Sequence, residues 1–128
     1  MGAGQIAKAA NQAIVGATLG IVAEMMLLAK TAGADPAKMR EALLGGFAGS
    51  RILDLHGQRM IDRSFDPGGR PRTQAKDLMQ AAEFAQSLEL SLPILEQCRD
   101  LWQAMVDAGM GDLDQSGYLA FAISLQKS

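Results

Sequence analysis

Three polar residues near the start of the chain have the types and spacing for acid–base chemistry. Lys8, Asn11 and Gln12 stand at positions i, i+3 and i+4, so on a helix their side chains leave the same face. A lysine held beside neutral amides and apolar surface has a lowered pKa, which lets it exchange a proton with a substrate hydroxyl. The amides can hold that hydroxyl without adding charge. The same residues also suit a solvated polar stripe, so the spacing alone leaves both interpretations open.

The segment just before Lys8 reads G-A-G-Q-I-A and matches the G-x-G-x-x-A pattern of dinucleotide-binding turns. That pattern works where a strand leads into a helix whose N-terminus faces the pyrophosphate. No strand pattern accompanies it here, and Glu24, the acidic residue at about the right distance, falls inside a helical pattern. We therefore expect the glycines to let the start of a long helix approach another part of the protein closely.

The bulk composition favours one helical domain and argues against several classes of function. The 128 residues are 48% hydrophobic and only 5% aromatic, and the abundant Ala and Leu are strong helix formers. A formal net charge of −2 provides no general attraction to nucleic acid or to an anionic membrane. One cysteine and one histidine exclude an internal disulfide and a Cys/His metal site, and they fit a cytoplasmic protein.

Apolar residues at steps of three and four predict a helix over residues 4–31, roughly 42 Å long. We expect it to be buried and too interrupted, by residues such as Thr18 and Glu24, to span a membrane. Gly33 is its expected terminator. Shorter helices should follow, giving an all-α fold of about six helices around one long central helix. Their expected N-terminal signals are Asp35-Pro36, Ser50, Thr73, Pro93 and a D-L-D-Q capping box at Asp112.

Three arginines flank a loop that glycines and prolines predict over Asp62–Arg72. Arg63, Arg70 and Arg72 suit either a solvated loop or an anion site at the N-terminus of the next helix.

Five further side chains have mainly structural explanations. His56 is expected to pack at the edge of the core, and Cys98 to be an inert residue inside it. Leu101 follows the helical pattern and is expected to face inward, and Leu88 is an apolar position of the helix expected after Thr73. Phe47, within the glycine-rich residues 45–49, suits either a substrate pocket or hydrophobic anchoring.

A series of sequence blocks runs along the whole chain in a recognisable order. The opening G-A-G-Q-I-A-K-A-A-N-Q is followed by A-E-M-M-L-L-A-K-T-A-G-A-D-P, Q-A-K-D-L-M-Q-A, L-P-I-L-E-Q-C-R-D-L-W and G-M-G-D-L-D-Q-S. Together they resemble the C-terminal domain of the β-hydroxyacid dehydrogenase family. That family includes 3-hydroxyisobutyrate dehydrogenase, 2-hydroxy-3-oxopropionate (tartronate semialdehyde) reductase and, more distantly, 6-phosphogluconate dehydrogenase. The resemblance implies the helical fold of the 6-phosphogluconate dehydrogenase C-terminal domain.

The resemblance also implies roles for four residues. Lys8 matches the family's catalytic lysine, the general acid/base for the hydroxyl while hydride moves to or from a nicotinamide. Asn11 and Gln12 fall where the family places substrate-contacting amides, although many members have Asn-Asn there, so which amide reaches the substrate stays open. Lys76 matches the lysine of the K-D-L block, which reaches the cofactor or substrate; without the resemblance it reads as an exposed first-turn lysine.

Taken as a whole, the resemblance implies that residues 1–128 are the substrate and dimerisation domain of a longer enzyme. A preceding Rossmann domain would bind most of the NAD or NADP, so the isolated domain is expected to be inactive. The expected substrate is a small 3-hydroxy acid of the 3-hydroxyisobutyrate or 2-hydroxy-3-oxopropionate/glycerate type. We expect a homodimer or higher homo-oligomer, with no nucleic-acid, membrane or metal partner. The alternative is a helical dimerisation module without a catalytic role.

Overall fold

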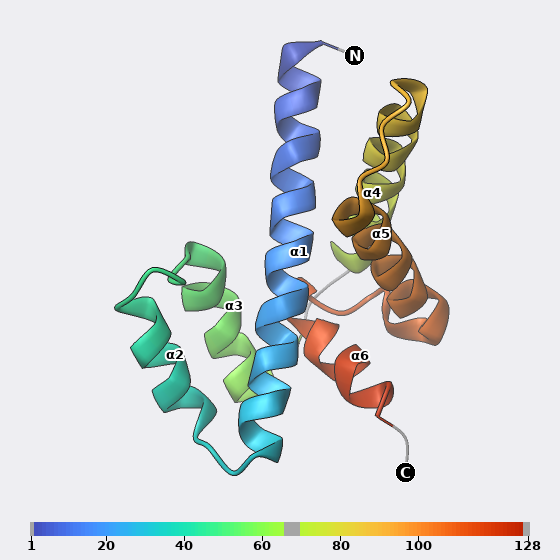
Figure 1. The fold of residues 1–128 in the computed structure, drawn as a ribbon. Coiled ribbons are helices and arrows are strands. Elements are labelled where there is room, and N and C mark those ends of the chain that lie inside the picture. Colours follow the sequence, from blue (N-terminus) through green and yellow to red (C-terminus); the bar gives the residue numbers. More distant parts are fainter. Residues whose placement is uncertain (1, 66–69, 127–128) are drawn as a thin grey trace.

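The first half of the chain forms a long helix with two short helices on one side. The computed structural model describes residues 2–65 and 70–126. Helix α1 (Ala3–Thr31) runs through the middle of the molecule (Figure 1). Helices α2 (Pro36–Leu44) and α3 (Arg51–Asp62) lie together on one side of it.

The second half covers the other side of α1. Helices α4 (Arg70–Ser87) and α5 (Pro93–Met105) run antiparallel to each other. A π turn (Val106–Met110) and a 3₁₀ turn (Gln115–Gly117) then lead to α6 (Tyr118–Ser124). The described residues form six α-helices and no strand, so the predicted all-α fold around a long central helix is confirmed.

Helix α1 is the core of the fold because α3, α4, α5 and α6 all pack against it. Leu19 and Ala23 on α1 are fully buried. The Trp102 and Tyr118 rings, with centroids 4.9 Å apart, close the core from α5 and α6. By length and composition alone α1 could cross a membrane, so the expectation that its interruptions disqualify it was wrong. The expectation that the helix is buried is met only in part, because only 28% of its apolar window is buried in this chain.

Two side chains lock α4 and α5 onto the N-terminal half of α1. Gln74 Nε2 donates a hydrogen bond to the Gln12 carbonyl at 2.7 Å, and Trp102 Nε1 donates to the Gly16 carbonyl at 3.1 Å. A Cβ on Gly16 would lie 2.7 Å from Gln74 Nε2 and 3.2 Å from Trp102 Nε1. The absence of a side chain at Gly16 therefore allows both bonds. A Cβ added at Gly4, in contrast, would have no neighbouring atom within 4 Å. The close approach expected at the start of α1 is therefore not made within this chain.

Several helix boundaries are those expected from capping. Gly33 adopts φ 87° at the end of α1, Asp35 accepts from the Ala37 N–H at 2.9 Å, and Ser50 accepts from the Leu53 N–H at 3.0 Å. Helix α5 begins at Pro93 as predicted.

Two boundary predictions were wrong. Helix α4 begins at Arg70, not at Thr73. The N–H groups of a first helical turn have no partner within the helix, so Pro71, which has no N–H, is tolerated there. The predicted loop over Asp62–Arg72 is therefore shorter, and its residues 66–69 lie outside the described residues.

The predicted capping box at Asp112 is also wrong, because the Asp112 carboxylate binds Arg72 at 3.0 Å instead. Asp114 caps the 3₁₀ turn, accepting from the Ser116 N–H at 3.0 Å and from its hydroxyl at 2.7 Å.

Several apolar side chains face solvent more than the pattern suggested, among them Leu88, Leu101 and Phe47. Leu101 is 37% exposed, so the expectation that it faces inward was wrong, and Leu88 is 55% exposed. Leu88 lies in the turn after α4, which ends at Ser87, and Leu101 lies one residue before the buried Trp102 of α5, at the edge of its buried face. Phe47 is fully exposed and does not anchor its loop within the chain.

A small, partly buried polar cluster lies where α3 meets the 3₁₀ turn. His56 Nδ1 is 3.6 Å from Asp114 Oδ2, and Arg59 Nε is 3.2 Å from the same oxygen. Burial lowers the pKa of His56 below its usual range; Asp114 opposes this effect and Arg59 reinforces it. Burial raises the pKa of Asp114, but hydrogen bonds from Ser116 and the nearby cations outweigh it and leave that pKa lowered. His56 thus packs at the core edge, as expected.

We expect the chain to lose stability as the pH falls from 7.5 to 5.5. Below the ordinary histidine pKa of 6.5, the unfolded chain protonates its imidazole before the folded chain does, which favours unfolding. Above that pH the imidazole is neutral in both states and the effect vanishes. This one group contributes at most about 1.4 kcal/mol per pH unit. Urea unfolding at the two pH values measures the loss, which should shrink in His56→Gln; an unchanged loss in that variant would contradict the assignment.

Candidate active site

The residues with acid–base potential meet in a cavity of about 180 Å³ between the N-terminal half of α1 and α4. Lys8 and Gln12 line it from α1, one helical turn apart, and Asp77 lines it from α4. Gln5 and Gln80 add further polar side chains to its wall. The spacing of Lys8 and Gln12 therefore does place both side chains toward one space.

A short chain of hydrogen bonds fixes the amide of Gln12. Its Nε2 donates to Asp77 Oδ2 at 2.9 Å, and its Oε1 accepts from Asn11 Nδ2 at 3.4 Å. Asn11 itself is exposed and does not line the cavity. Of the two adjacent amides, Gln12 therefore faces the cavity, and Asp77 holds it there.

Lys8 is exposed in this chain, and no ion pair within the described residues includes it. The expected partial dehydration is thus not provided by this chain alone. The reason is geometric, because the walls around Lys8 come from α1 and α4 and leave the remaining side open. A further protein surface over that side would dehydrate the ammonium group.

Asp77 is the residue that sequence reasoning missed, whereas its neighbour Lys76 was singled out. Lys76 is exposed and does not line the cavity. Gln74, Leu78 and Ala81 of α4 are buried. Asp77 is three residues after Gln74 and four before Ala81, so it lies on the same side of the helix. The helical phase of α4 was the signal that could have identified Asp77.

The three arginines do not come together as one anion site. Arg72 pairs with Asp112, which raises the pKa of the guanidinium, and Arg63 lines a different cavity at the end of α3. Arg70 is the exposed first residue of α4. Arg70 and Arg72 share the first turn of α4 but Arg63 lies at the end of α3, so of the two interpretations left open by the sequence, one anion site formed by all three arginines is not seen.

Two remaining candidates bring no reactive group to the site. Cys98 is buried as expected, and burial raises the pKa of its thiol, which disfavours the reactive thiolate. Within residues 2–65 and 70–126, no three His, Cys, Asp or Glu side chains gather as a metal site. What the cavity offers is an ammonium, a carboxylate and an oriented amide facing one space. Such a set can bind a hydroxylated small molecule and exchange a proton with it.

Comparison with known proteins gives a consistent family. Residues 2–122 match the family described as "NAD-binding of NADP-dependent 3-hydroxyisobutyrate dehydrogenase". The 2-hydroxy-3-oxopropionate reductase of Escherichia coli K12 is 46% identical over 115 residues, covering 90% of this chain and 39% of the reductase. A probable 3-hydroxyisobutyrate dehydrogenase-like 1, mitochondrial, from Arabidopsis thaliana is 36% identical over 126 residues, covering 98% of this chain and 37% of that protein.

A solved structure agrees with these matches. The crystal structure of 3-hydroxyisobutyrate dehydrogenase from Salmonella typhimurium superimposes with a TM-score of 0.83 at 25% identity, covering 90% of this chain and 40% of that one. The chain thus spans about two fifths of the length of the relatives it matches. Lys8, Gln12 and Asp77 all lie inside the matched range. The chain belongs to the NAD-binding family of NADP-dependent 3-hydroxyisobutyrate dehydrogenase, as its sequence blocks indicated.

Proposed function

We propose that this chain supplies the catalytic lysine and the subunit interface of an NAD- or NADP-dependent dehydrogenase. Its substrate is a small 3-hydroxy acid of the 3-hydroxyisobutyrate or 2-hydroxy-3-oxopropionate/glycerate type, in line with the names of the relatives. The observation that carries the proposal is the cavity in which Lys8 from α1 and Asp77 from α4 face the same space.

Lys8 is the general acid/base in this mechanism. In the oxidation direction, neutral Lys8 takes the proton from the substrate hydroxyl as the C–H bond breaks and the C=O bond forms. In the reduction direction, its ammonium returns that proton to the carbonyl oxygen. The nicotinamide of the cofactor, when bound, accepts or provides the hydride.

The neighbouring residues hold the substrate and shape the cavity. Gln12 reaches into the cavity with a fixed amide, so it is the amide positioned to contact a substrate polar group. Asp77 is a positioning residue that acts through Gln12. Asn11 steadies the other end of that amide.

The cofactor requires a second domain. The described residues contain no strand, so they lack the strand–turn–helix that holds a dinucleotide pyrophosphate. These residues would contact the reactive nicotinamide end of the cofactor, at the open side of the cavity beside exposed Lys8. A preceding Rossmann domain would hold the rest and cover Lys8. Exposed Lys76, next to Asp77 in the second turn of α4, would reach the cofactor.

Assays of the complete enzyme test the proposal. We expect oxidation of short 3-hydroxy acids, and reduction of the matching semialdehydes, in the presence of NAD(H) or NADP(H). The 128-residue chain alone should show no turnover, because it lacks the dinucleotide-binding fold. Turnover by the isolated chain, or no activity of the complete enzyme on any of these substrates, would contradict the proposal.

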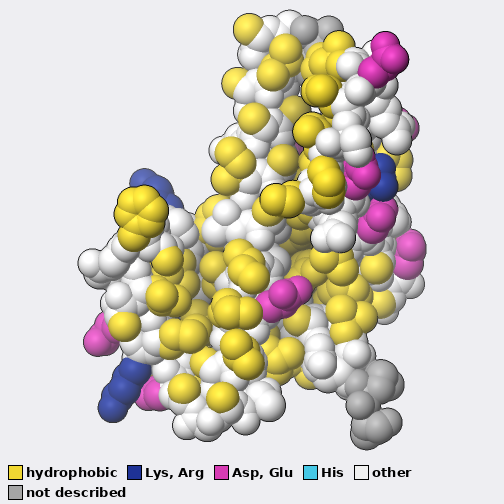
Figure 2. Space-filling view, viewed as in Figure 1, with side chains coloured by type: hydrophobic (Ala, Val, Ile, Leu, Met, Phe, Trp, Pro, Cys, Tyr) yellow, Lys and Arg dark blue, Asp and Glu magenta, His cyan; other side chains and the backbone are white. Residues whose placement is uncertain are grey.

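A second copy of the chain is the partner we propose for the exposed face of α1. Ile14, Ile21 and Leu28 are 64%, 52% and 58% exposed and recur every seven residues, which places them in one stripe. Ile94 on α5 is 77% exposed, and an apolar cavity beside Ile21 runs between α1 and α5. Figure 2 shows apolar side chains gathered over this face. The exposed Glu24 interrupts this apolar face, and an exposed apolar surface with a few polar groups is typical of a subunit interface.

Substitution of the centre of this stripe should separate the subunits. We expect light scattering to give twice the chain mass for the unmodified chain and the mass of one chain for Ile21→Glu, because a buried unpaired carboxylate opposes association. Leu55→Glu is the matched control, because Leu55 is also a branched aliphatic side chain and is 62% exposed, but it lies on α3. A monomer at high concentration of the unmodified chain would count against the interface.

A further inference from the structure

A second cavity lies at the opposite end of α1 from Lys8. It has a volume of about 170 Å³ and is enclosed by the last turns of α1, the first turn of α2, the end of α3 and Leu119 of α6. Lys8 and Lys30 are 22 residues apart on one helix, so about 33 Å separates the two cavities along α1. Whatever the second cavity binds is therefore remote from the proposed chemistry.

The floor of this cavity is apolar and well packed. Met26, Met60 and Leu119 form it and are 3%, 1% and 4% exposed. These side chains come from α1, α3 and α6, so the shape of the floor is fixed by the core. A short aliphatic group would rest on this surface without meeting a buried polar atom.

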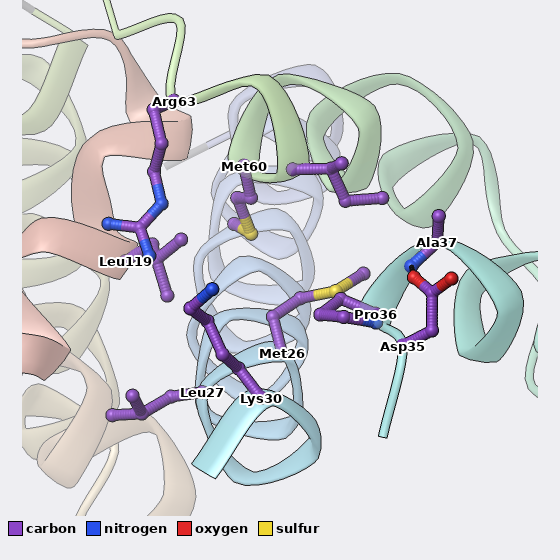
Figure 3. A pocket seen from close by; sticks show the side chains of 10 residues that line it. Met26, Leu27, Lys30, Asp35, Pro36, Ala37, Met60, Arg63 and Leu119 are labelled. Carbon is purple, nitrogen blue, oxygen red and sulfur yellow. Dashed lines mark hydrogen bonds between the residues drawn. The ribbon is translucent and has the colours of Figure 1, made fainter. Parts of the chain in front are cut away.

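Two cations face the cavity from different elements. Lys30 lies in the last turn of α1 and Arg63 caps the end of α3. Figure 3 shows the two side chains extending toward each other across the cavity. Both residues are exposed, so water and salt screen their mutual repulsion in part, and an anion held between them would relieve the remainder.

No carboxylate within the described residues neutralises this pair. No ion pair there includes Lys30 or Arg63. Asp35 is the acidic residue on the cavity wall, and its carboxylate accepts from the Ala37 N–H at 2.9 Å, as the cap of α2. Figure 3 shows that carboxylate turned toward Ala37, away from the two cations.

The backbone conformation of Arg63 is that of a residue that ends a helix. Arg63 adopts φ 55° and ψ 37°, a left-handed conformation that glycine occupies without steric cost and arginine does not. Helices commonly end with glycine in this conformation. The chain places a guanidinium there instead, at the mouth of a cavity.

We propose that this cavity binds a small organic carboxylate with a short aliphatic body. The carboxylate lies between the Lys30 ammonium and the Arg63 guanidinium, which suit it by charge and hydrogen bonding. The aliphatic part rests on the floor formed by Met26, Met60 and Leu119. This binding does not depend on the proposed dehydrogenase function.

Methionine methyl NMR of the 128-residue chain tests the proposal, with butyrate as the probe. Butyrate should shift the methyl signals of Met26 and Met60, and the uncharged n-butanol at equal concentration should not. Arg63→Gly keeps the left-handed backbone and removes the guanidinium, and Lys30→Gln removes the ammonium. Each of these two substitutions should raise the apparent Kd for butyrate by about tenfold or more. Lys38→Gln, an exposed lysine on α2 outside the cavity, should leave it unchanged.

Three outcomes would overturn the proposal. The first is that butyrate shifts neither methyl signal. The second is that butyrate binds Arg63→Gly as tightly as the unmodified chain. The third is that inorganic phosphate binds and butyrate does not, which would assign the cations to an inorganic anion.

Discussion

Replacement of Lys8 by alanine in the complete enzyme is expected to lower kcat by about 10²–10⁴-fold, the usual contribution of a general acid/base. The substitution removes the group that exchanges a proton with the substrate oxygen. It should leave the fold intact, because Lys8 is exposed and contributes no ion pair within the described residues. Steady-state rates at saturating substrate and cofactor measure the loss, and urea unfolding shows that stability is retained.

Two further variants distinguish the catalytic role of Lys8 from the binding roles of Lys76 and Asp77. Lys76→Ala should mainly raise the KM for the cofactor, because Lys76 lies outside the cavity. Asp77→Asn should raise the KM for the substrate, because the Gln12 amide loses its charged acceptor. An unchanged kcat in Lys8→Ala would favour the alternative of a helical dimerisation module without a catalytic role.

Gly16→Val is expected to destabilise the chain by roughly 2–5 kcal/mol. Its Cβ would lie 2.7 Å from Gln74 Nε2 and 3.2 Å from Trp102 Nε1, and Gln74 and Trp102 are buried. The valine must displace both side chains from the carbonyls of α1, leaving buried polar groups unpaired. Urea unfolding measures the effect. Because Asp77 and Gln74 share α4, the displacement should also weaken substrate binding.

Gly4→Ala is the matched control for Gly16→Val. Both glycines lie in α1, but a Cβ at Gly4 meets nothing within 4 Å. Alanine also has a higher helix propensity than glycine, so stability should stay the same or rise slightly. Equal stabilities for Gly16→Val and the unmodified chain would contradict the assigned role of Gly16.

The sequence predicted most of the fold because local signals determine most of it. The period of three to four in apolar residues specified α1, and Asp35 and Ser50 capped the helices that they were expected to cap. The errors arose where a distant partner decided the outcome. Arg72 of α4 draws Asp112 away from the predicted capping box, and nothing near Asp112 in the sequence announces that pair.

The candidate site was predictable only in part for the same reason. Lys8 and Gln12 share a helix, so their spacing alone placed them together. Asp77 reaches them only because Gln74 and Trp102 hold α4 and α5 against α1, which is a tertiary effect. The converging pair of Lys30 and Arg63 likewise comes from two elements that are distant in the sequence.

The most direct test of the central claim is chemical rescue of Lys8→Ala in the complete enzyme by added methylamine. If the lysine nitrogen exchanges a proton with the substrate oxygen, a small amine occupying the vacated space should restore part of the hydride-transfer rate, in proportion to its concentration. The same amine should leave the rate of Lys76→Ala unchanged. A Lys8→Ala enzyme that transfers hydride at the unmodified rate, with no response to methylamine, would contradict the account.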